Sequence, residues 1–186
     1  MIRSTHANLK TFHNTTTITA LSMLKQKNTA ELLALFKILD APTFNEMDGE
    51  YNAELLDFGG QIPNIIGKLC TYEPVLNGKW LSKAFTPGSN NISYGYNAFN
   101  KFGKVIRKYP MRTEMALSRF DSKPIFQLTY SAYPTLLAKI NMIDEIRKVE
   151  EGIYLGIGTV GFTKKQRMTP LPFCLIGPTS DFAGVD

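Results

Sequence analysis

Short segments of alternating or nearly continuous apolar residues recur through the chain after Pro42, and each is closed by turn-forming residues. Successive side chains of a strand point to opposite faces, so segments of this length and pattern are typical of β-strands. Groups of Asn, Gly, Pro, Asp and Ser separate them and predict tight connections. The predicted strands are GEYNAELLDF from Gly49, GKWLSKAF from Gly78, KVIRKYPMRTEMA from Lys104, PIFQLTYSAY from Pro124, MIDEIRKV from Met142, GIYLGIGTVGF from Gly152 and PLPFCLIG from Pro170.

Seven or more such strands in succession favour an antiparallel meander, in which neighbours along the chain pair with one another. A meander of this length usually closes on itself, because closure removes the unpaired edges of its first and last strands. The chain has 186 residues, which is enough for one substantial core and short for two. The sequence therefore predicts a mainly β protein built on a single antiparallel β-barrel.

One N-terminal helix is expected ahead of the strands, in the segment NTAELLALFKIL. Asn28 stands three residues before Glu31, a spacing at which each side chain can satisfy a free backbone N–H at the start of a helix. Leucine and phenylalanine then recur at helical spacing and form one apolar stripe. Pro42 ends the helix. We expect this helix to pack on the barrel as a lid or plug.

Residues 1–28 differ in composition from the rest of the chain. They contain no acidic residue and are rich in Thr, Ser and Asn, and their charges are Arg3, Lys10, Lys25 and Lys27. We interpret them as a polar, basic arm ahead of a single helix-plus-barrel domain over residues 29–186. The same composition resembles an organelle transit leader. Two locations therefore remain open, the cytoplasm and an organelle to which the arm would direct the protein.

The charge of the chain argues against a nucleic-acid partner. The formal net charge is +5, but a nucleic-acid-binding face normally gathers Lys and Arg in one patch or stripe. Here they are spread out, and the tightest cluster, KKQR at 164–167, lies between two predicted strands and is expected to be a solvated hairpin tip. No window approaches the roughly eighteen apolar residues of a membrane-spanning helix, so no membrane span is expected. The oligomeric state is left open.

Residue types of common catalytic and metal sites are scarce in the predicted barrel. Both histidines, His6 and His13, lie in the arm, so neither a histidine-based triad nor a typical zinc site is expected. Asp144 and Glu145 are adjacent and point to opposite faces of a strand, so they cannot share a proton as a catalytic pair does. A carboxylate-only metal site would need more converging acids than the strands supply. We therefore expect no metal and no cofactor.

A basic and an aromatic side chain are expected together on the strand that contains VIRKYPMR. Arg107 and Tyr109 are two residues apart, so strand alternation places them on one face in an apolar row. A guanidinium beside a phenol could bind a carboxylate, the arginine through two hydrogen bonds and the tyrosine through its hydroxyl. In the structural alternative, Arg107 pairs with a neighbouring acid and Tyr109 is a half-buried aromatic residue.

Several segments between Thr29 and Gly177 occur in an order known from one family: ELLALFKIL, MDGEYNAEL, NGKWLSKAF, RFDSKPIF, IDEIRKVEEGIYLGIG and LPFCLIG. This order resembles the lipocalin-like proteins named for a Gly-x-Trp-x-Gly motif, which are similar in shape to the calycin group of ligand-binding barrels. Tyr51 and Ala53 stand where the motif carries its tryptophan and its second glycine. The resemblance implies a lipocalin- or calycin-like barrel and an association with small apolar molecules, with no reaction attached.

The resemblance also adds candidates for a ligand site. The family-like pattern carries an Asp and an Arg in IDEIRKVEE, so Asp144 and Arg147 are expected at the mouth of a pocket; ordinary ion pairs on the strand are the alternative. Trp80, in NGKWLSKAF, is a further ligand-binding candidate. Tyr130 is another, although the sequence leaves open which face of its segment points inward.

Three functions fit these expectations. The leading one is a carrier or sensor whose barrel binds a small hydrophobic molecule, with a carboxylate as a candidate head group and the helix as lid. The second is a cofactor-independent enzyme, such as an isomerase, cyclase or lyase, that acts on an apolar substrate inside the same barrel. It would use Tyr109, Tyr130 or a buried Asp as acid or base. The third is a filled barrel that serves as an interaction module through its basic arm.

Overall fold

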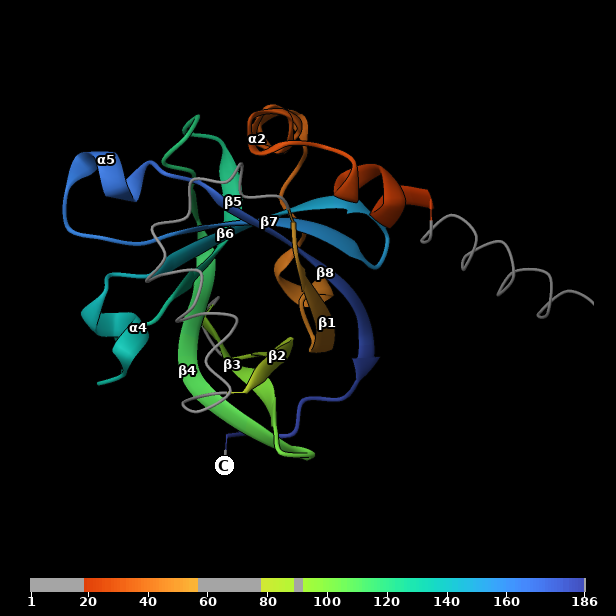
Figure 1. Ribbon diagram of the computed structural model, residues 1–186, viewed down its shortest axis with the longest axis vertical. Helices are drawn as coiled ribbons and strands as arrows, with labels where there is room; N and C mark the ends of the chain where they lie inside the picture. Colours follow the sequence, from red (N-terminus) through yellow and green to blue (C-terminus); the bar gives the residue numbers. More distant parts are fainter. Residues whose placement is uncertain (1–18, 57–77, 89–91, 186) are drawn as a thin grey trace, which may run out of the picture.

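Eight antiparallel strands form a closed barrel in the computed structural model, which describes residues 19–56, 78–88 and 92–185 (Figure 1). Each strand pairs with the next one along the chain, and the first pairs with the last. The predicted meander and its closure are therefore confirmed. The strands are β1 (Gly49–Leu55), β2 (Lys79–Pro87), β3 (Ile92–Lys101), β4 (Lys104–Leu117), β5 (Pro124–Thr129), β6 (Ile143–Glu150), β7 (Ile153–Thr159) and β8 (Leu171–Ser180).

Each of the seven segments predicted as strands overlaps one strand of the barrel. The sequence pattern does not predict β3, because Ser, Gly and Asn interrupt its apolar residues and all three are poor strand formers or neutral at best. The predicted strand from Pro124 is too long, since β5 ends at Thr129 and the chain then turns towards the short helix α4 (Leu136–Lys139).

The helix α2 (Thr29–Ile38) begins as the sequence predicts. Asn28 accepts a hydrogen bond from the backbone N–H of Glu31 at 3.0 Å, and Glu31 accepts one from the backbone N–H of Asn28 at 2.8 Å. These two bonds satisfy donors that a helix start otherwise leaves free.

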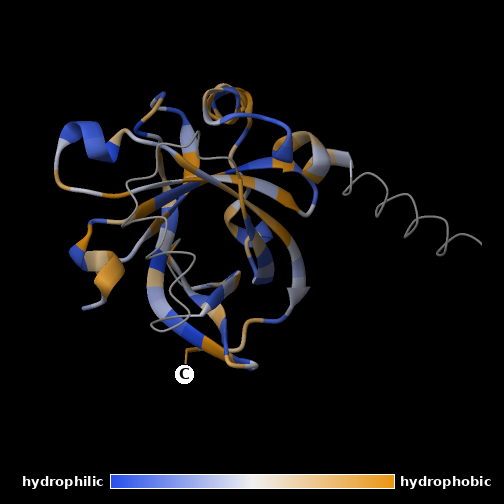
Figure 2. Ribbon diagram, viewed as in Figure 1, coloured by the Kyte–Doolittle hydropathy of each residue, from blue (hydrophilic) through white to orange (hydrophobic). Residues whose placement is uncertain are grey.

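The prediction of one N-terminal helix is wrong in number. Residues 19–25 form another helix just before α2, and the 3-10 turn η1 (Phe44–Glu46) comes just after it. Besides α4, the helix α5 (Lys164–Arg167) joins β7 to β8. It is the KKQR cluster, its four residues are exposed, and Figure 2 shows it as hydrophilic. These helices are too short to be visible as periodic patterns in the sequence.

An apolar cluster inside the barrel forms the inner core. It includes Tyr51, Phe85, Met111, Phe126 and Phe173, which come from five different strands and are almost completely buried. Their rings pack edge to face or tilted, as for Phe85 and Phe126, whose centroids lie 5.5 Å apart. Aromatic side chains thus make up half of the buried residues in this inner core.

A second apolar cluster lies on the outside of the barrel wall, beneath α2. Leu32 and Phe36 of α2 pack there against residues of β7 and β8, among them Leu155 and Cys174 (Figure 1). Cys174 is a free thiol, and burial raises its pKa to about 12. The expectation that this helix is a lid over the barrel is therefore wrong, because its apolar stripe packs against the outside of the barrel wall.

Among the described residues, different side chains complete the inner core at the two ends of the barrel. At the end where β1 begins, the segment before it adds Phe44 and Met47 to the inner core, and Tyr51 donates a hydrogen bond to the carbonyl of Glu46 at 2.7 Å. At the other end, where β1 finishes and β2 begins, several inner side chains are only partly buried. They are Leu55, Trp80, Tyr109 and Met142, and we call this the partly exposed end.

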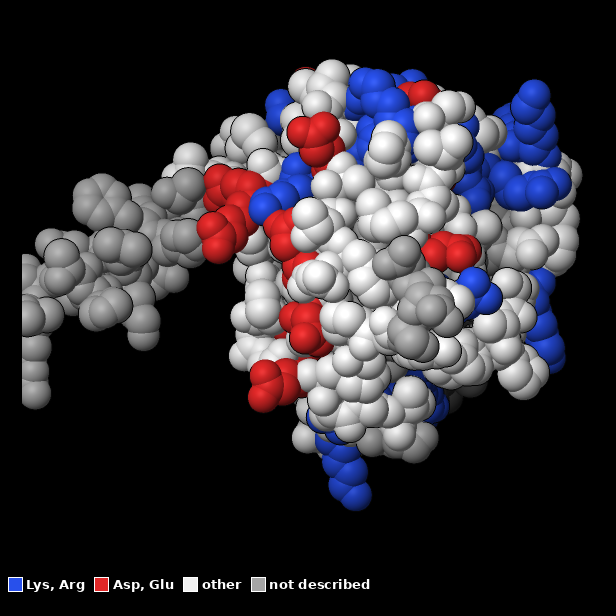
Figure 3. All heavy atoms as spheres, turned by 180° about the vertical axis from the view of Figure 1, so that it is seen from behind, with Lys and Arg blue, Asp and Glu red and all other residues white. Residues whose placement is uncertain are grey.

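On one face of the molecule, charged side chains lie in separate groups (Figure 3). On the face that Figure 3 shows, acidic side chains form a column along one side, whereas basic ones gather at the top and on the opposite side. Among the described residues, no helix is both long and apolar enough to cross a bilayer. Residues 1–18, with both histidines, and residues 57–77, with Cys70, lie outside the described part of the chain.

Candidate functional site

Four polar side chains meet inside the barrel, near its partly exposed end. Lys83 of β2 places its Nζ 2.8 Å from Asp144 Oδ2 of β6, and donates hydrogen bonds to Asn97 Oδ1 at 2.9 Å and to the Tyr130 hydroxyl at 2.7 Å. The Tyr130 hydroxyl in turn donates to Asp144 Oδ2 at 2.9 Å. The side chain of Lys83 is 2% exposed and that of Asp144 is 0% exposed. We call these four residues the inner polar cluster.

Strand register brings the inner polar cluster together. Lys83 pairs with Asn97 across β2 and β3, so their side chains lie on the same face of the wall. Lys83 stands two residues before Phe85, and Asp144 stands two residues before Ile146, and both of these neighbours belong to the inner core. The alternation that builds the apolar interior therefore also points a lysine and an aspartate into it.

Aromatic rings surround the ammonium group of Lys83. Its Nζ lies 5.2 Å from the ring centre of Trp80, 5.5 Å from that of Tyr130 and 5.4 Å from that of Phe173. The negative faces of such rings attract a cation. The indole N–H of Trp80 also donates to Asn97 Oδ1 at 3.2 Å, which ties the ring to the polar cluster.

Burial of the Lys83–Asp144 pair costs stability unless other contacts offset it. Removing two charges from water costs several kcal/mol for each ion, and a well-packed apolar pair is often as stable or more stable. Tyr130 and Asn97 supply the additional hydrogen bonds that such a pair requires. A charged, hydrogen-bonded cluster in an aromatic core is therefore a candidate for a functional site.

The two oxygens of Asp144 have different surroundings. Oδ2 contacts both Lys83 and Tyr130. Oδ1 is equally buried but has no hydrogen-bond partner in the described part of the chain. Buried carboxylate oxygens are normally bonded, so this one is a free acceptor inside the barrel.

The structure brings together three of the residues predicted for a ligand site: Trp80, Tyr130 and Asp144. Lys83 and Asn97 are functional candidates that the sequence analysis missed. A signal for Lys83 was present, since it lies two residues before Phe85 and so interrupts an apolar strand face with a charge. Asn97 carries no comparable signal, because the segment around it was not predicted to be a strand.

Arg107 and Tyr109 do not share a face of the strand, so they do not form the predicted carboxylate-binding pair. The register of β3 and β4 shifts between Gly95 and Asn97, and Tyr109 has a positive φ of 55° at this irregularity. Tyr109 packs inward, with its ring 5.8 Å from that of Phe99. Arg107 lies outside, with its guanidinium 5.8 Å from the ring centre of Tyr96. A bulge changes the face of every side chain beyond it, which period-two counting cannot foresee.

Asp144 and Arg147 also lie on opposite sides of the wall, so they do not form one pocket mouth together. Arg147 points outward and forms a two-point ion pair with Asp121, at 2.7 and 2.8 Å, and donates to the carbonyl of Phe36 at 2.7 Å. The hydrogen bond from Arg147 lowers the pKa of Asp121. Arg147 therefore connects α2 to the turn between β4 and β5, which is a structural role.

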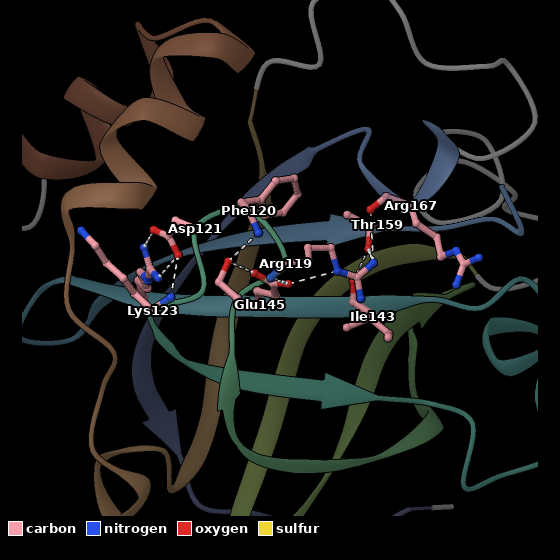
Figure 4. A network of polar contacts seen from close by, with 10 residues as sticks. Arg119, Phe120, Asp121, Lys123, Ile143, Glu145, Thr159 and Arg167 are labelled. Carbon is pink, nitrogen blue, oxygen red and sulfur yellow. Dashed lines mark hydrogen bonds and ion pairs between the residues drawn. The ribbon is translucent and has the colours of Figure 1, made fainter. Parts of the chain in front are cut away.

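Glu145, next to Asp144, organises a second polar network on the outer wall (Figure 4). It accepts hydrogen bonds from the Ser118 hydroxyl at 2.5 Å and from the backbone N–H and Nε of Arg119, both at 3.1 Å. Arg119 also donates to Thr159 Oγ1 at 2.6 Å and to the carbonyl of Arg167 at 3.2 Å. This network fixes the β4–β5 turn against β6 and β7.

A surface cleft of about 490 Å³ lies beside this outer network, lined by Arg119, Asn141, Ile143, Lys164, Arg167 and Met168. The guanidinium of Arg119 already forms an ion pair with Glu145, and Arg167 donates a hydrogen bond to the carbonyl of Phe162 at 2.9 Å. The arginines of the cleft are thus held by contacts within the protein. In the described residues, no three His, Cys, Asp or Glu side chains lie where they could hold a metal ion.

Comparisons with known proteins give a match at the level of fold. No protein-family model matches the chain, and no curated protein matches it. Among solved structures, it is similar to a protein from Thermomonospora curvata, with a TM-score of 0.54 and 17% sequence identity. The match covers 81% of this chain and 87% of that one. At this identity the likeness shows a common fold, and the function has to be argued from the site.

Proposed function

We propose that this barrel binds a small, largely apolar molecule at its partly exposed end, as a carrier or sensor. The observation that carries the proposal is the inner polar cluster, in which the buried pair of Lys83 and Asp144 stands among aromatic rings. Small-molecule sites are typically lined by apolar and aromatic side chains and contain a few placed polar groups. This combination occurs here on the inside of the barrel.

The place of the cluster within the barrel supports the same function. At the end where β1 begins Met47 is fully buried, whereas at the other end, among the described residues, Trp80 and Tyr109 are only partly buried. A molecule that enters there would meet the aromatic side chains first and the inner polar cluster next. We also infer kinship with the lipocalin-like Gly-x-Trp-x-Gly family, supported by the order of the segments and by the closed barrel that follows a capped helix.

The first test of this function is to look for a molecule that copurifies with the protein. Native mass spectrometry should show a stoichiometric adduct that denaturing extraction releases. The variant Lys83→Met should carry less of it, whereas Glu145→Gln, which removes a buried charge from the outer face of the same wall, should carry the normal amount. An empty protein that also ignores a panel of fatty acids, retinoids and sterols would contradict the proposal.

A second candidate function is an enzyme of the same shape, and the position of Tyr130 favours it. Its hydroxyl lies 2.7 Å from Lys83 Nζ and 2.9 Å from Asp144 Oδ2, so an ammonium and a carboxylate both contact one phenol. Such contacts can supply or accept a proton during general acid–base catalysis.

Tyr130→Phe separates the two functions, because it removes the hydroxyl and keeps the ring. A carrier with this substitution should still bind its molecule, with at most a modest loss of affinity. An enzyme should bind the molecule but no longer convert it. Mass spectrometry of the copurified molecule, after incubation with each protein, reports binding and conversion together. Absence of any product with the unchanged protein would argue for the carrier.

A further inference from the structure

The unbonded oxygen of Asp144 restricts the chemistry of the molecule that the barrel can accept. Oδ1 is fully buried and has no hydrogen-bond partner among the described residues, although its companion Oδ2 has two. A buried acceptor without a donor is costly, and the cost is removed when a ligand supplies the donor. A ligand that places a donor group at this oxygen would therefore remove the cost.

The charge of the ligand group at this position can be argued from its neighbours. A carboxylate would bring a second negative charge beside Asp144 and would be repelled in a desolvated interior. An ammonium would lie close to Lys83, whose own charge already neutralises the aspartate at 2.8 Å. A neutral donor avoids both penalties, and a hydroxyl is a common one that is also compatible with an apolar molecule.

We propose that the molecule bound in the barrel carries a hydroxyl or another uncharged hydrogen-bond donor, which donates to Asp144 Oδ1. This inference rests on the proposed function and narrows its ligand to molecules with an uncharged hydrogen-bond donor, such as alcohols and phenols, in place of free acids. It replaces the carboxylate head group expected from Arg107, which lies outside the barrel.

A substitution at Gly158 can block Asp144 Oδ1 without removing the ion pair between Lys83 and Asp144. Gly158 pairs with Asp144 across β6 and β7, and a Cβ at this position would lie 3.0 Å from Asp144 Oδ1. The variant Gly158→Ala therefore places a methyl group where the ligand donor should sit. Lys83, Tyr130 and Oδ2 keep their contacts in this variant, so the test removes the acceptor position and not the whole cluster.

A matched series of probes tests the inference: decanol, methyl decyl ether, decanoate and decylammonium. They share an alkyl chain and differ in the polar end. Trp80 is the only tryptophan of the chain, so its fluorescence reports on binding next to the cluster. A parallel series of naphthol and methoxynaphthalene, measured by calorimetry, covers flat aromatic ligands. We expect the alcohol or phenol to bind about tenfold to a hundredfold more tightly than its ether, the effect of one hydrogen bond to a charged acceptor.

The variants give the second part of the test. Gly158→Ala should reduce the affinity for the alcohol to the level of the ether and leave the affinity for the ether nearly unchanged. Glu145→Gln should change neither. If Gly158→Ala does not fold, as judged by circular dichroism, the comparison of probes on the unchanged protein still decides.

The outcomes distinguish this inference from the proposed function. Equal affinity for alcohol and ether, or tightest binding of decanoate or decylammonium, would overturn the inference and leave the binding function standing. The same holds if Gly158→Ala folds and binds the alcohol as tightly as before. If no member of either series binds, the binding function itself falls, and the inference falls with it.

Discussion

Gly156 and Phe173 face each other across β7 and β8, and the phenylalanine ring occupies the space that a side chain at position 156 would need. A Cβ on Gly156 would lie 2.1 Å from Cζ of Phe173, far inside van der Waals contact. The same ring lies 5.4 Å from Lys83 Nζ. The glycine therefore allows Phe173 to form one wall around the inner polar cluster.

Gly156→Ala should lower the free energy of unfolding by about 1 to 3 kcal/mol, because the added methyl forces Phe173 out of its position. Urea unfolding followed by circular dichroism measures the loss. In the background Phe173→Leu the same substitution should cost clearly less, since the smaller side chain can move aside. An equal cost in both backgrounds would show that the ring is not the cause.

Loss of one partner of the inner ion pair should be strongly destabilising. Lys83→Met leaves Asp144 buried without its cation, and we expect a loss of about 3 to 5 kcal/mol in the free energy of unfolding. The double variant with Asp144→Leu should lose less than the two single losses together, because it leaves no unpaired charge. Urea unfolding of all three proteins measures this coupling, and strictly additive losses would refute it.

The contact between Arg147 and Asp121 should hold α2 on the barrel. Arg147→Lys keeps the charge but cannot form the two-point pair and the bond to the Phe36 carbonyl at once, and we expect it to cost about 1 to 3 kcal/mol. Hydrogen exchange should quicken in α2 before it does in the barrel. Arg112→Lys, in a partly exposed pair with Glu114, is the control and should change stability by less than about 0.5 kcal/mol. Unchanged exchange in α2 would be evidence against the connection.

Stability should depend on pH through Glu46. Its hydrogen bonds with Lys148 and with the backbone N–H of Thr43 lower its pKa from 4.5 to about 2. A lowered pKa contributes stability that is complete above the ordinary value and is lost as the pH falls towards the folded one. The free energy of unfolding should therefore decrease between about pH 4.5 and about pH 2. Glu46→Gln and Lys148→Met should both flatten this decrease in urea titrations, and an unchanged slope in both would contradict the assignment.

Much of the fold could be predicted from the sequence because its signals are local. Alternation within seven segments, the turn residues between them and the Asn28 cap each depend on a few neighbouring residues. Closure followed from the need to pair the first and last strands. Strand β3 lacks such a pattern, since polar residues and a glycine interrupt its apolar residues.

The candidate site could be predicted only in part, because it depends on which face each side chain takes. Counting by two separated Asp144 from Glu145 correctly along strand β6. It failed for Arg107 and Tyr109, since the register of β4 shifts at Tyr109 and places the two side chains on opposite faces. Lys83 was not predicted because a buried lysine needs an oppositely charged partner, and its partner Asp144 lies on a strand distant in the sequence.

Closure of the barrel by β1 and β8 has a consequence for how the chain is made. β1 can pair with β8 only after nearly the whole barrel sequence between them has been synthesised. Until Leu171–Ser180 has left the ribosome, β1 and β7 are edge strands whose unpaired N–H and C=O groups can pair with other chains. A premature stop before Leu171 would leave both edge strands permanently unpaired. Such fragments should therefore aggregate into inclusion bodies, even though they contain seven of the eight strands.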